Sequence, residues 1–157
     1  MTLKRKIVIA SDHGGFILKK EIKNWLKKQG YKVQDLGTNN SKGVDYPVYA
    51  QKVAEAIGQE LATEGILICS SGIGMSMAAN RFPGVRAALC RTPKDAATTK
   101  KHNLANVLCL GAEETSSALA FQIVETWLKS ETGKEERYQR RAALLDFLGR
   151  SHCSGCF

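Results

Sequence analysis

Residues Gly65-Ile-Leu-Ile-Cys69 form a short apolar run, and the five residues after them, Ser70-Ser-Gly-Ile-Gly74, are mostly small and turn-forming. A continuous apolar run of this length, bounded by turn residues, is typical of a strand that is buried on both faces. The sequence after the turn predicts a helix that ends near Asn80. A buried strand that enters a helix through a glycine-rich turn is the repeating unit of a parallel sheet.

The same alternation of strand and helix continues along the rest of the chain. Strands are predicted over residues 6–10, 31–36, 65–69, 85–90 and 105–110. Helices are predicted over residues 16–29, 46–61, 93–102, 114–129 and 134–148, in addition to the one that ends near residue 80. Because such alternation requires right-handed crossovers, we expect an α/β fold, a five-stranded parallel sheet with helices on both faces and a C-terminal helix. We expect one domain over residues 1–150 and a flexible tail over residues 151–157.

The composition is that of a globular protein. Of 157 residues, 43% are hydrophobic and 24% are charged, which supplies a core and excludes an intrinsically disordered chain. No apolar run approaches the roughly 18 residues of a membrane helix and no export signal begins the chain, so we predict a cytoplasmic protein without membrane contact. Five cysteines without a regular framework argue against a disulfide scaffold. We predict no metal at the isolated Cys153 and Cys156 pair beside His152.

The net charge of +8 is concentrated at the start of the chain. Residues 1–32 hold nine lysines and arginines, against Asp12 and Glu21. A solvated lysine face on one helix explains this bias, and an attractive field for a small phosphate or a nucleic acid is the alternative. Aromatic residues are not interleaved with these lysines as a base-stacking platform requires, so we expect no nucleic-acid partner.

Three loops are expected to meet at one edge of the sheet, because ligands in this architecture bind beyond the carboxyl ends of the strands. They are Ser11-Asp-His-Gly-Gly15, Cys69-Ser-Ser-Gly-Ile-Gly74 and the stretch after Cys90. In the second loop, converging backbone N–H groups and a helix N-terminus suit a phosphate or the oxyanion that develops during catalysis. Cys69, at the rim of that loop, is a candidate base or nucleophile, and the alternative is a buried cysteine before a tight turn.

Other charged and titratable residues fit the same chemistry. Asp12 and His13 follow the first strand and are candidates for proton transfer or for gripping hydroxyls and phosphate; the alternative is a helix cap beside a surface histidine. Arg137 and Arg141 are four residues apart and share a helix face that suits a phosphate dianion, unless that helix is simply a solvated one. His102, at the end of a short helix, becomes a candidate only through these neighbours.

On these residues the sequence resembles the ribose-5-phosphate isomerase B family, whose relatives include the subunits of galactose-6-phosphate isomerase. Each matching segment alone is a weak signal, but their order and spacing over about residues 6–148 are specific. The segments are Ala10-Ser-Asp-His-Gly-Gly-Phe16, Asp35-Leu-Gly-Thr38, Val44-Asp-Tyr-Pro47, Gly65-Ile-Leu-Ile-Cys69, Gly72-Ile-Gly-Met-Ser76, Ala78-Ala-Asn80, His102-Asn103, Asn106-Val107, and Arg137 with Arg141.

The resemblance implies a Rossmann-like, three-layer α/β fold. It also implies a homodimer, or a dimer of dimers, whose active sites are shared between subunits. The implied activity is the interconversion of ribose 5-phosphate and ribulose 5-phosphate, in the non-oxidative branch of the pentose phosphate pathway. The resemblance implies neither a metal nor an organic cofactor.

The resemblance also implies a role for each matched residue. Cys69 is the base that moves a proton between carbons 2 and 1 of the sugar, and Ser71 assists ring opening and proton handling. Backbone amides of Ser70, Gly72, Ile73 and Gly74 stabilise the enediolate. The other implied roles are ring opening for Asp12 and His102, hydroxyl binding for Tyr46 and Asn103, and phosphate binding for His13, Arg137 and Arg141. His102 and Asn103 are expected from the partner subunit.

Two residues depart from the family pattern. Ser70 stands where the family usually has glycine, and it would be strained if the turn needed a positive φ. Glu113 stands near the position, shortly after the fifth strand, where family members often carry a phosphate-binding arginine. Two alternatives stay open: a hexose-6-phosphate isomerase of the same fold, acting on allose or galactose 6-phosphate, and a non-catalytic sugar-phosphate-binding module, which both departures favour.

Overall fold

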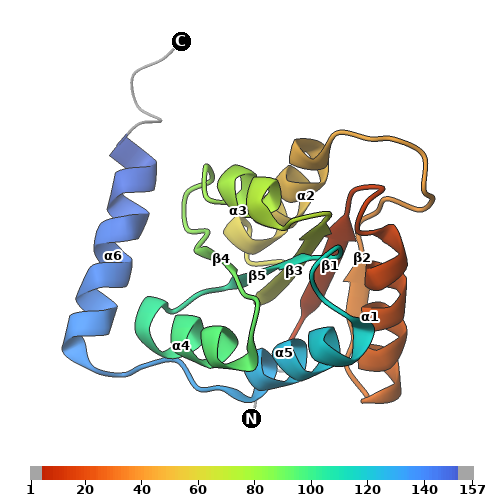
Figure 1. The fold of residues 1–157 in the computed structure, drawn as a ribbon. Helices are drawn as coiled ribbons and strands as arrows, with labels where there is room; N and C mark the ends of the chain where they lie inside the picture. The colour runs from red at the N-terminus through yellow and green to blue at the C-terminus, as the bar shows by residue number, and fades with distance from the viewer. Residues whose placement is uncertain (1–4, 152–157) are drawn as a thin grey trace.

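A sheet of five parallel strands forms the centre of the protein, whose residues 5–151 are described by a computed structural model. The strands, in the spatial order β2-β1-β3-β5-β4, are β1 (Ile7–Ser11), β2 (Val33–Asp35), β3 (Glu64–Cys69), β4 (Ala87–Leu89) and β5 (Val107–Gly111). The helices are α1 (Phe16–Lys28), α2 (Tyr46–Gly58), α3 (Ile73–Ala79), α4 (Pro93–Asn103), α5 (Ser117–Lys129) and α6 (Glu136–Ser151). The predicted α/β architecture is confirmed (Figure 1).

Alternate residues of each central strand enter two separate apolar layers, as expected for a sheet that is covered on both faces. In β3, Ile66 and Ile68 pack with α1 and α5, whereas Leu67 and Cys69 pack with α2 and α3. Figure 1 shows α2 and α3 above the sheet, α4 and α5 below it and α1 at the right beside β2, and α1 and α5 share one apolar layer. Cys69 therefore belongs to the face that α2 and α3 cover.

The register aligns the carboxyl ends of the central strands. Ser11, the last residue of β1, pairs with Ile68, and Cys69, the last residue of β3, pairs with Gly111 of β5. The loops that follow these strands therefore leave the sheet side by side, as the rule for parallel sheets predicts.

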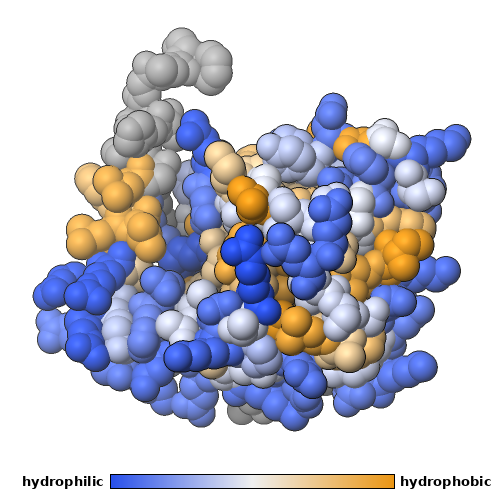
Figure 2. All heavy atoms as spheres, in the orientation of Figure 1, coloured by the Kyte–Doolittle hydropathy of each residue, from blue (hydrophilic) through white to orange (hydrophobic). Residues whose placement is uncertain are grey.

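Helix α6 stands apart from the two layers and lies beside α4 (Figure 1). Arg86 Nη1 donates to both carboxylate oxygens of Asp146, at 2.8 and 2.9 Å, and so ties α6 to the chain that enters β4. The apolar side chains of Leu144, Leu145 and Phe147 on α6 are 57%, 50% and 65% exposed. Figure 2 shows apolar side chains gathered over this helix.

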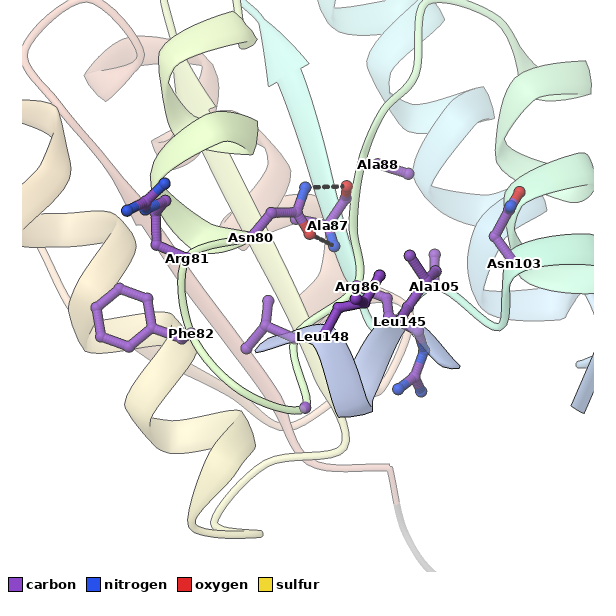
Figure 3. A pocket seen from close by; sticks show the side chains of 12 residues that line it. Asn80, Arg81, Phe82, Arg86, Ala87, Ala88, Asn103, Ala105, Leu145 and Leu148 are labelled. Atoms are coloured by element: carbon purple, nitrogen blue, oxygen red, sulfur yellow. Dashed lines mark hydrogen bonds between the residues drawn. The ribbon is translucent and has the colours of Figure 1, made fainter. Parts of the chain in front are cut away.

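Strand β4 is an edge strand, and Asn80 occupies part of its outer side. The Asn80 side-chain amide donates to the Ala87 carbonyl and accepts from the Ala87 N–H, both at 2.8 Å (Figure 3). The amide thus makes the pair of hydrogen bonds that a neighbouring strand would make with Ala87.

Two predicted helix boundaries were wrong for local reasons. Helix α2 ends at Gly58 and not at Leu61, because Glu60 adopts a left-handed φ of 57° and the Leu61 N–H donates back to the Ala56 carbonyl, as in a Schellman motif. Helix α5 begins at Ser117 and not at residue 114, because the Ser116 side chain caps it by accepting from the Leu119 N–H at 3.3 Å.

The remaining boundaries also shifted. The strands predicted over residues 31–36 and 85–90 are shorter, at Val33–Asp35 and Ala87–Leu89, and the last helix runs from Glu136 to Ser151. The rest of the predicted tail, including Cys153 and Cys156, lies outside the described residues. Within residues 5–151, none of the helices combines the length and the apolar character that a bilayer crossing requires.

Candidate active site

The loop after β1 brings Asp12 and His13 to the carboxyl edge of the sheet. Asp12 is 7% exposed, and its Oδ1 accepts from the Gly15 N–H at 3.0 Å, so it closes the turn that begins α1. His13 is exposed, and its Nδ1 accepts from the Val44 N–H at 3.2 Å. A neutral His13 therefore carries its proton on Nε2, where it can donate to an anion.

The loop after β3 folds back over the Cys69 sulfur. The Gly72 N–H donates to Cys69 Sγ at 3.1 Å, and Gly72 has a left-handed φ of 74°. A Cβ at position 72 would lie 2.6 Å from a Leu89 methyl group and 2.8 Å from the Leu110 carbonyl carbon, so only glycine fits this turn. Cys69 is 5% exposed and lies at the floor of the site, deeper than the rim position that the sequence predicted.

Two amides of this loop are available to an anion. The N–H groups of Gly72 and Ile73 donate to Cys69 Sγ and to Ser71 Oγ, respectively. Within residues 5–151, the N–H groups of Ser70 and Ser71 donate to no partner. Unpaired amides beside a potential base are what an oxyanion that forms during proton transfer requires.

The loops after β1 and β3 are in direct contact. The Asp12 N–H donates to the Ile68 carbonyl at 3.3 Å, and a side chain at Gly14 would overlap Ser70 Oγ. Tyr46, the first residue of α2, lays its ring against Gly74, where a Cβ would come within 2.7 Å of the ring. Asp12, His13, Tyr46, Cys69 and the loop Ser70–Gly74 together form what we call the strand-end cluster.

The two departures from the family pattern lie beside this cluster. The only non-glycine residues with positive φ in the described part of the chain are Glu60 and Leu104, so Ser70 occupies its turn without the strain considered above. The Glu113 N–H donates to the Ser70 carbonyl at 3.0 Å, and its side chain is exposed. Glu113 thus lies next to the amide-rich loop through its backbone.

The other predicted residues gather around the ends of α4 and α6. His102 lies in the last turn of α4, and its ring stacks on Tyr138 with centroids 4.8 Å apart. Arg137 Nη2 donates to the Tyr138 hydroxyl at 2.9 Å. Arg141 is exposed one turn further along α6. With Asn103, the last residue of α4, these residues form what we call the helix-end cluster.

A single chain does not bring the two clusters together. Cys69 is at the carboxyl end of β3, whereas His102 and Asn103 precede β5, whose first residue, Val107, pairs with Gly65. Gly65 and Cys69 are four residues apart along β3, which corresponds to a distance of about 13 Å. The clusters therefore lie at opposite ends of the sheet (Figure 1).

An apolar groove of about 540 Å³ lies between α6 and the β4 edge of the sheet. Figure 3 shows that Leu145 and Leu148 of α6 line it from one side and that Phe82 and Ala87 line it from the other. Asn103 of the helix-end cluster also lines this groove, but Cys69 does not.

The other described cysteines, Cys90 and Cys109, are packing residues in the core. Both are fully buried, and burial raises the pKa of the Cys90 thiol to about 11 and that of the Cys109 thiol further. Within residues 5–151, no three His, Cys, Asp or Glu side chains cluster as a metal ion would need. The Cys153 and Cys156 pair lies outside this range.

Sequence reasoning missed two contacts of these clusters. Tyr138 touches both His102 and Arg137, and the backbone N–H of Val44 sets the orientation of His13. An aromatic residue directly after Arg137 was a usable signal for the first contact. Nothing in the sequence indicated the second contact, because it joins residues 31 positions apart, with a helix and a strand between them.

Comparison with known proteins identifies relatives of this chain. The profile of a family described as ribose/galactose isomerase matches residues 7–145. Ribose-5-phosphate isomerase B of Escherichia coli strain K12 is 42% identical over 140 residues, which cover 89% of this chain and 94% of that protein. Two solved structures of ribose-5-phosphate isomerase B are also similar. The one from Clostridium thermocellum has a TM-score of 0.91 and 44% identity over 94% of this chain and 99% of its own. The one from Thermotoga maritima has a TM-score of 0.89 and 45% identity, and the match covers 92% of this chain and 99% of that chain.

Proposed function

The chain belongs to the ribose/galactose isomerase family, and we propose that it interconverts ribose 5-phosphate and ribulose 5-phosphate. The resemblance predicted from the sequence and the isomerase class are confirmed by the relatives described above. The observation that carries the proposed chemistry is the position of Cys69 Sγ at the floor of a loop with two unpaired amides.

We propose that the strand-end cluster performs the proton transfer. Cys69 Sγ removes the proton from carbon 2 of the open-chain aldose, and the oxygen of carbon 1 gains a proton as the enediolate forms. The oxygen of carbon 2 gives up its hydroxyl proton as the ketone forms, and Cys69 returns the first proton to carbon 1, so no proton is gained or lost overall. The negative charge that develops on the sugar oxygens in the enediolate is stabilised by amides of Ser70–Gly74. Asp12 and Ser71 assist ring opening, and Tyr46 binds a sugar hydroxyl.

The phosphate is proposed to lie between His13 of this cluster and two arginines of the helix-end cluster. His13 Nε2 donates to it, because the Val44 N–H already occupies Nδ1. Arg137 and Arg141 supply positive charge from one face of α6. Binding energy from the phosphate is remote from the reacting carbons and orients them for proton transfer.

The second half of each site is proposed to come from a second copy of the chain, in a homodimer or a dimer of dimers. Two observations support this assembly. The clusters lie at opposite ends of the sheet in one chain, and the exposed apolar side chains of α6 border a groove beside Asn103. His102, Asn103, Arg137 and Arg141 would then face Cys69 of the partner. We propose one domain that acts in the cytoplasm without nucleic acid.

A complementation assay tests the shared site. We expect Cys69→Ala and His102→Ala chains each to be inactive alone. A 1:1 mixture, unfolded and refolded together, is expected to recover about one quarter of wild-type activity, because half of the dimers are mixed and each mixed dimer holds one intact site. No recovery, with mixed dimers demonstrated by tagged chains, would contradict a shared site.

Turnover of ribose 5-phosphate, allose 6-phosphate and galactose 6-phosphate by the wild-type protein tests the substrate. We expect the largest kcat/KM for ribose 5-phosphate. Preference for a hexose 6-phosphate would replace the pentose assignment, and binding of ribose 5-phosphate without formation of ribulose 5-phosphate would indicate a non-catalytic module.

A further inference from the structure

Tyr138 contacts two proposed active-site side chains that come from different helices. Its ring stacks on His102 of α4, with an interplanar angle of 26°, and its hydroxyl accepts from Arg137 of α6. The Arg137 guanidinium also lies over the Tyr138 ring, 4.7 Å from the centroid. Tyr138 itself is 5% exposed, although His102 and Arg137 are both exposed.

The connection between α5 and α6 holds Tyr138 in this place. The Gly133 N–H donates to the Lys101 carbonyl at 3.1 Å, and a Cβ at position 133 would overlap that carbonyl and lie 2.7 Å from the Tyr138 ring. Gln139 Nε2 closes the turn from the other side by donating to the Gly133 carbonyl at 2.7 Å. The chain thus passes close against the C-terminal end of α4, directly before it presents Tyr138 to His102.

From this geometry we infer that Tyr138 is a positioning residue for the isomerase reaction, which orders both the His102 ring and the Arg137 guanidinium before substrate binds. This inference rests on the proposed function and deepens it. Arginine has many rotamers, and a guanidinium that is already ordered loses less entropy when it binds phosphate. The stacked ring fixes the plane of the imidazole, and therefore the directions in which its two nitrogens can exchange protons.

Two substitutions separate these two effects. Tyr138→Phe keeps the ring and removes the acceptor of Arg137, so we expect KM for ribose 5-phosphate to rise about 3- to 10-fold with kcat nearly unchanged, as the loss of one hydrogen bond predicts. Tyr138→Leu also removes the stacking surface, so we expect kcat to fall by about 10-fold or more, because a misoriented proton-transfer group is costly. Tyr31→Phe, which removes a hydroxyl from the half-buried Tyr31 outside both clusters, is the matched control and leaves both constants unchanged.

The imidazole proton signals of His102 in NMR spectra supply a readout that does not depend on turnover. These signals, assigned with a His102→Asn variant, are shifted by the ring current of Tyr138. We expect Tyr138→Leu to displace them, and Tyr138→Phe to leave them near their wild-type positions. If Tyr138 had only a structural role, its substitution would lower the melting temperature of the protein. The His102 signals would then not respond differently to Tyr138→Leu and Tyr138→Phe.

The proposal is overturned if Tyr138→Phe leaves KM unchanged, or if Tyr138→Leu leaves the His102 signals in place. Should Tyr138→Leu fail to fold, Tyr138→Phe decides, since its ring retains the packing. If the wild-type protein does not turn over ribose 5-phosphate, the proposed function fails, and the NMR arm alone decides whether Tyr138 orients His102.

Discussion

The strand-end and helix-end clusters are built by opposite means. The strand-end cluster is held by backbone: an amide fixes the Cys69 sulfur, another fixes His13, and glycines at positions 72 and 74 let the chain pack where any side chain would collide. The helix-end cluster is held by side chains: the His102 ring stacks on Tyr138, and Arg137 donates a hydrogen bond to the Tyr138 hydroxyl. Proton transfer at carbon needs the more rigid frame, whereas a phosphate can be gripped by longer side chains on helix ends.

The largest effect is expected at the sulfur. Cys69→Ala removes the proposed base, and we expect kcat to fall by about 10³-fold, within the range of general base catalysis, while binding of substrate persists. Steady-state kinetics and calorimetric titration with ribose 5-phosphate measure the two properties. Cys90→Ala makes the same chemical change at a fully buried thiol outside both clusters and is the control. Equal activity of Cys69→Ala and the wild type would remove Cys69 from the mechanism.

The second largest effect on kcat is expected for a substitution at Gly72. Gly72→Ala forces a Cβ against Leu89 and the Leu110 backbone at a φ of 74°, so the turn must move and its N–H leaves the sulfur. We expect kcat to fall by about 10²-fold and the free energy of unfolding to fall by about 1–3 kcal/mol, as for other strained positions.

Gly30→Ala is the matched control for that substitution. Gly30 has a φ of 84°, but nothing lies within 4 Å of its missing Cβ, so the control keeps the backbone strain and lacks the collision. Chemical denaturation and kinetics of both variants separate the two causes. If Gly30→Ala lost as much kcat as Gly72→Ala, the close approach at Gly72 would not be what matters.

At the helix-end cluster, Arg137→Ala is expected to act on binding. We expect KM to rise about 10- to 100-fold with a minor change in kcat, as the loss of a charged hydrogen bond to phosphate predicts. Arg140→Ala, at a neighbouring exposed position of α6, is the control and leaves KM unchanged. An unchanged KM in Arg137→Ala would withdraw its assignment.

The smallest effect concerns the support beneath the strand-end cluster. Lys19 and Lys23 donate to Asp35, and Lys19 also donates to the Thr38 carbonyl, which fixes the loop that leads to Val44. Burial alone would raise the pKa of Asp35, but the two ammonium groups outweigh it and hold that pKa below its ordinary value of 3.8. The ionised carboxylate therefore stabilises the fold above about pH 4, and this stabilisation is lost as the pH falls through the lowered pKa.

Asp35→Asn is accordingly expected to lower the free energy of unfolding by about 2 kcal/mol at neutral pH, as for a part-buried charge pair. The difference from wild type shrinks below pH 4. Urea denaturation at several pH values measures it. Glu125→Gln, which breaks an exposed pair with Lys129, is expected to cost less than about 0.5 kcal/mol. A pH-independent loss in Asp35→Asn would show that its charge is not the stabilising feature.

The architecture was predictable because its signal is local. The strands Ile7–Ser11, Glu64–Cys69 and Val107–Gly111 are buried along their whole length, so the apolar runs in the sequence were enough to locate them. Helix ends were harder, since the left-handed Glu60 that ends α2 belongs to a residue type that rarely adopts this conformation. Ser116 is a typical N-cap residue and could have indicated that α5 begins at Ser117, but the predicted start followed the apolar periodicity instead.

The candidate site was predictable only in part. The strand-end residues follow from the rule that parallel strands end at one edge of the sheet, which applies to the loops after β1 and β3 alike. The burial of Cys69 could not be read from the sequence, because it depends on how the Gly72 turn folds back over the sulfur. The stacking of Tyr138 on His102 joins residues 36 positions apart through a close approach at Gly133, and residue types alone do not indicate it.

The hydrogen bonds between Asn80 and Ala87 have a consequence for solubility. An uncovered edge strand can template endless sheet growth from one molecule to the next, which is a route to amyloid. The Asn80 amide occupies the backbone groups of Ala87 that a strand of another molecule would otherwise pair with. Contacts between molecules on the β4 side can therefore involve helices and loops without joining the two sheets.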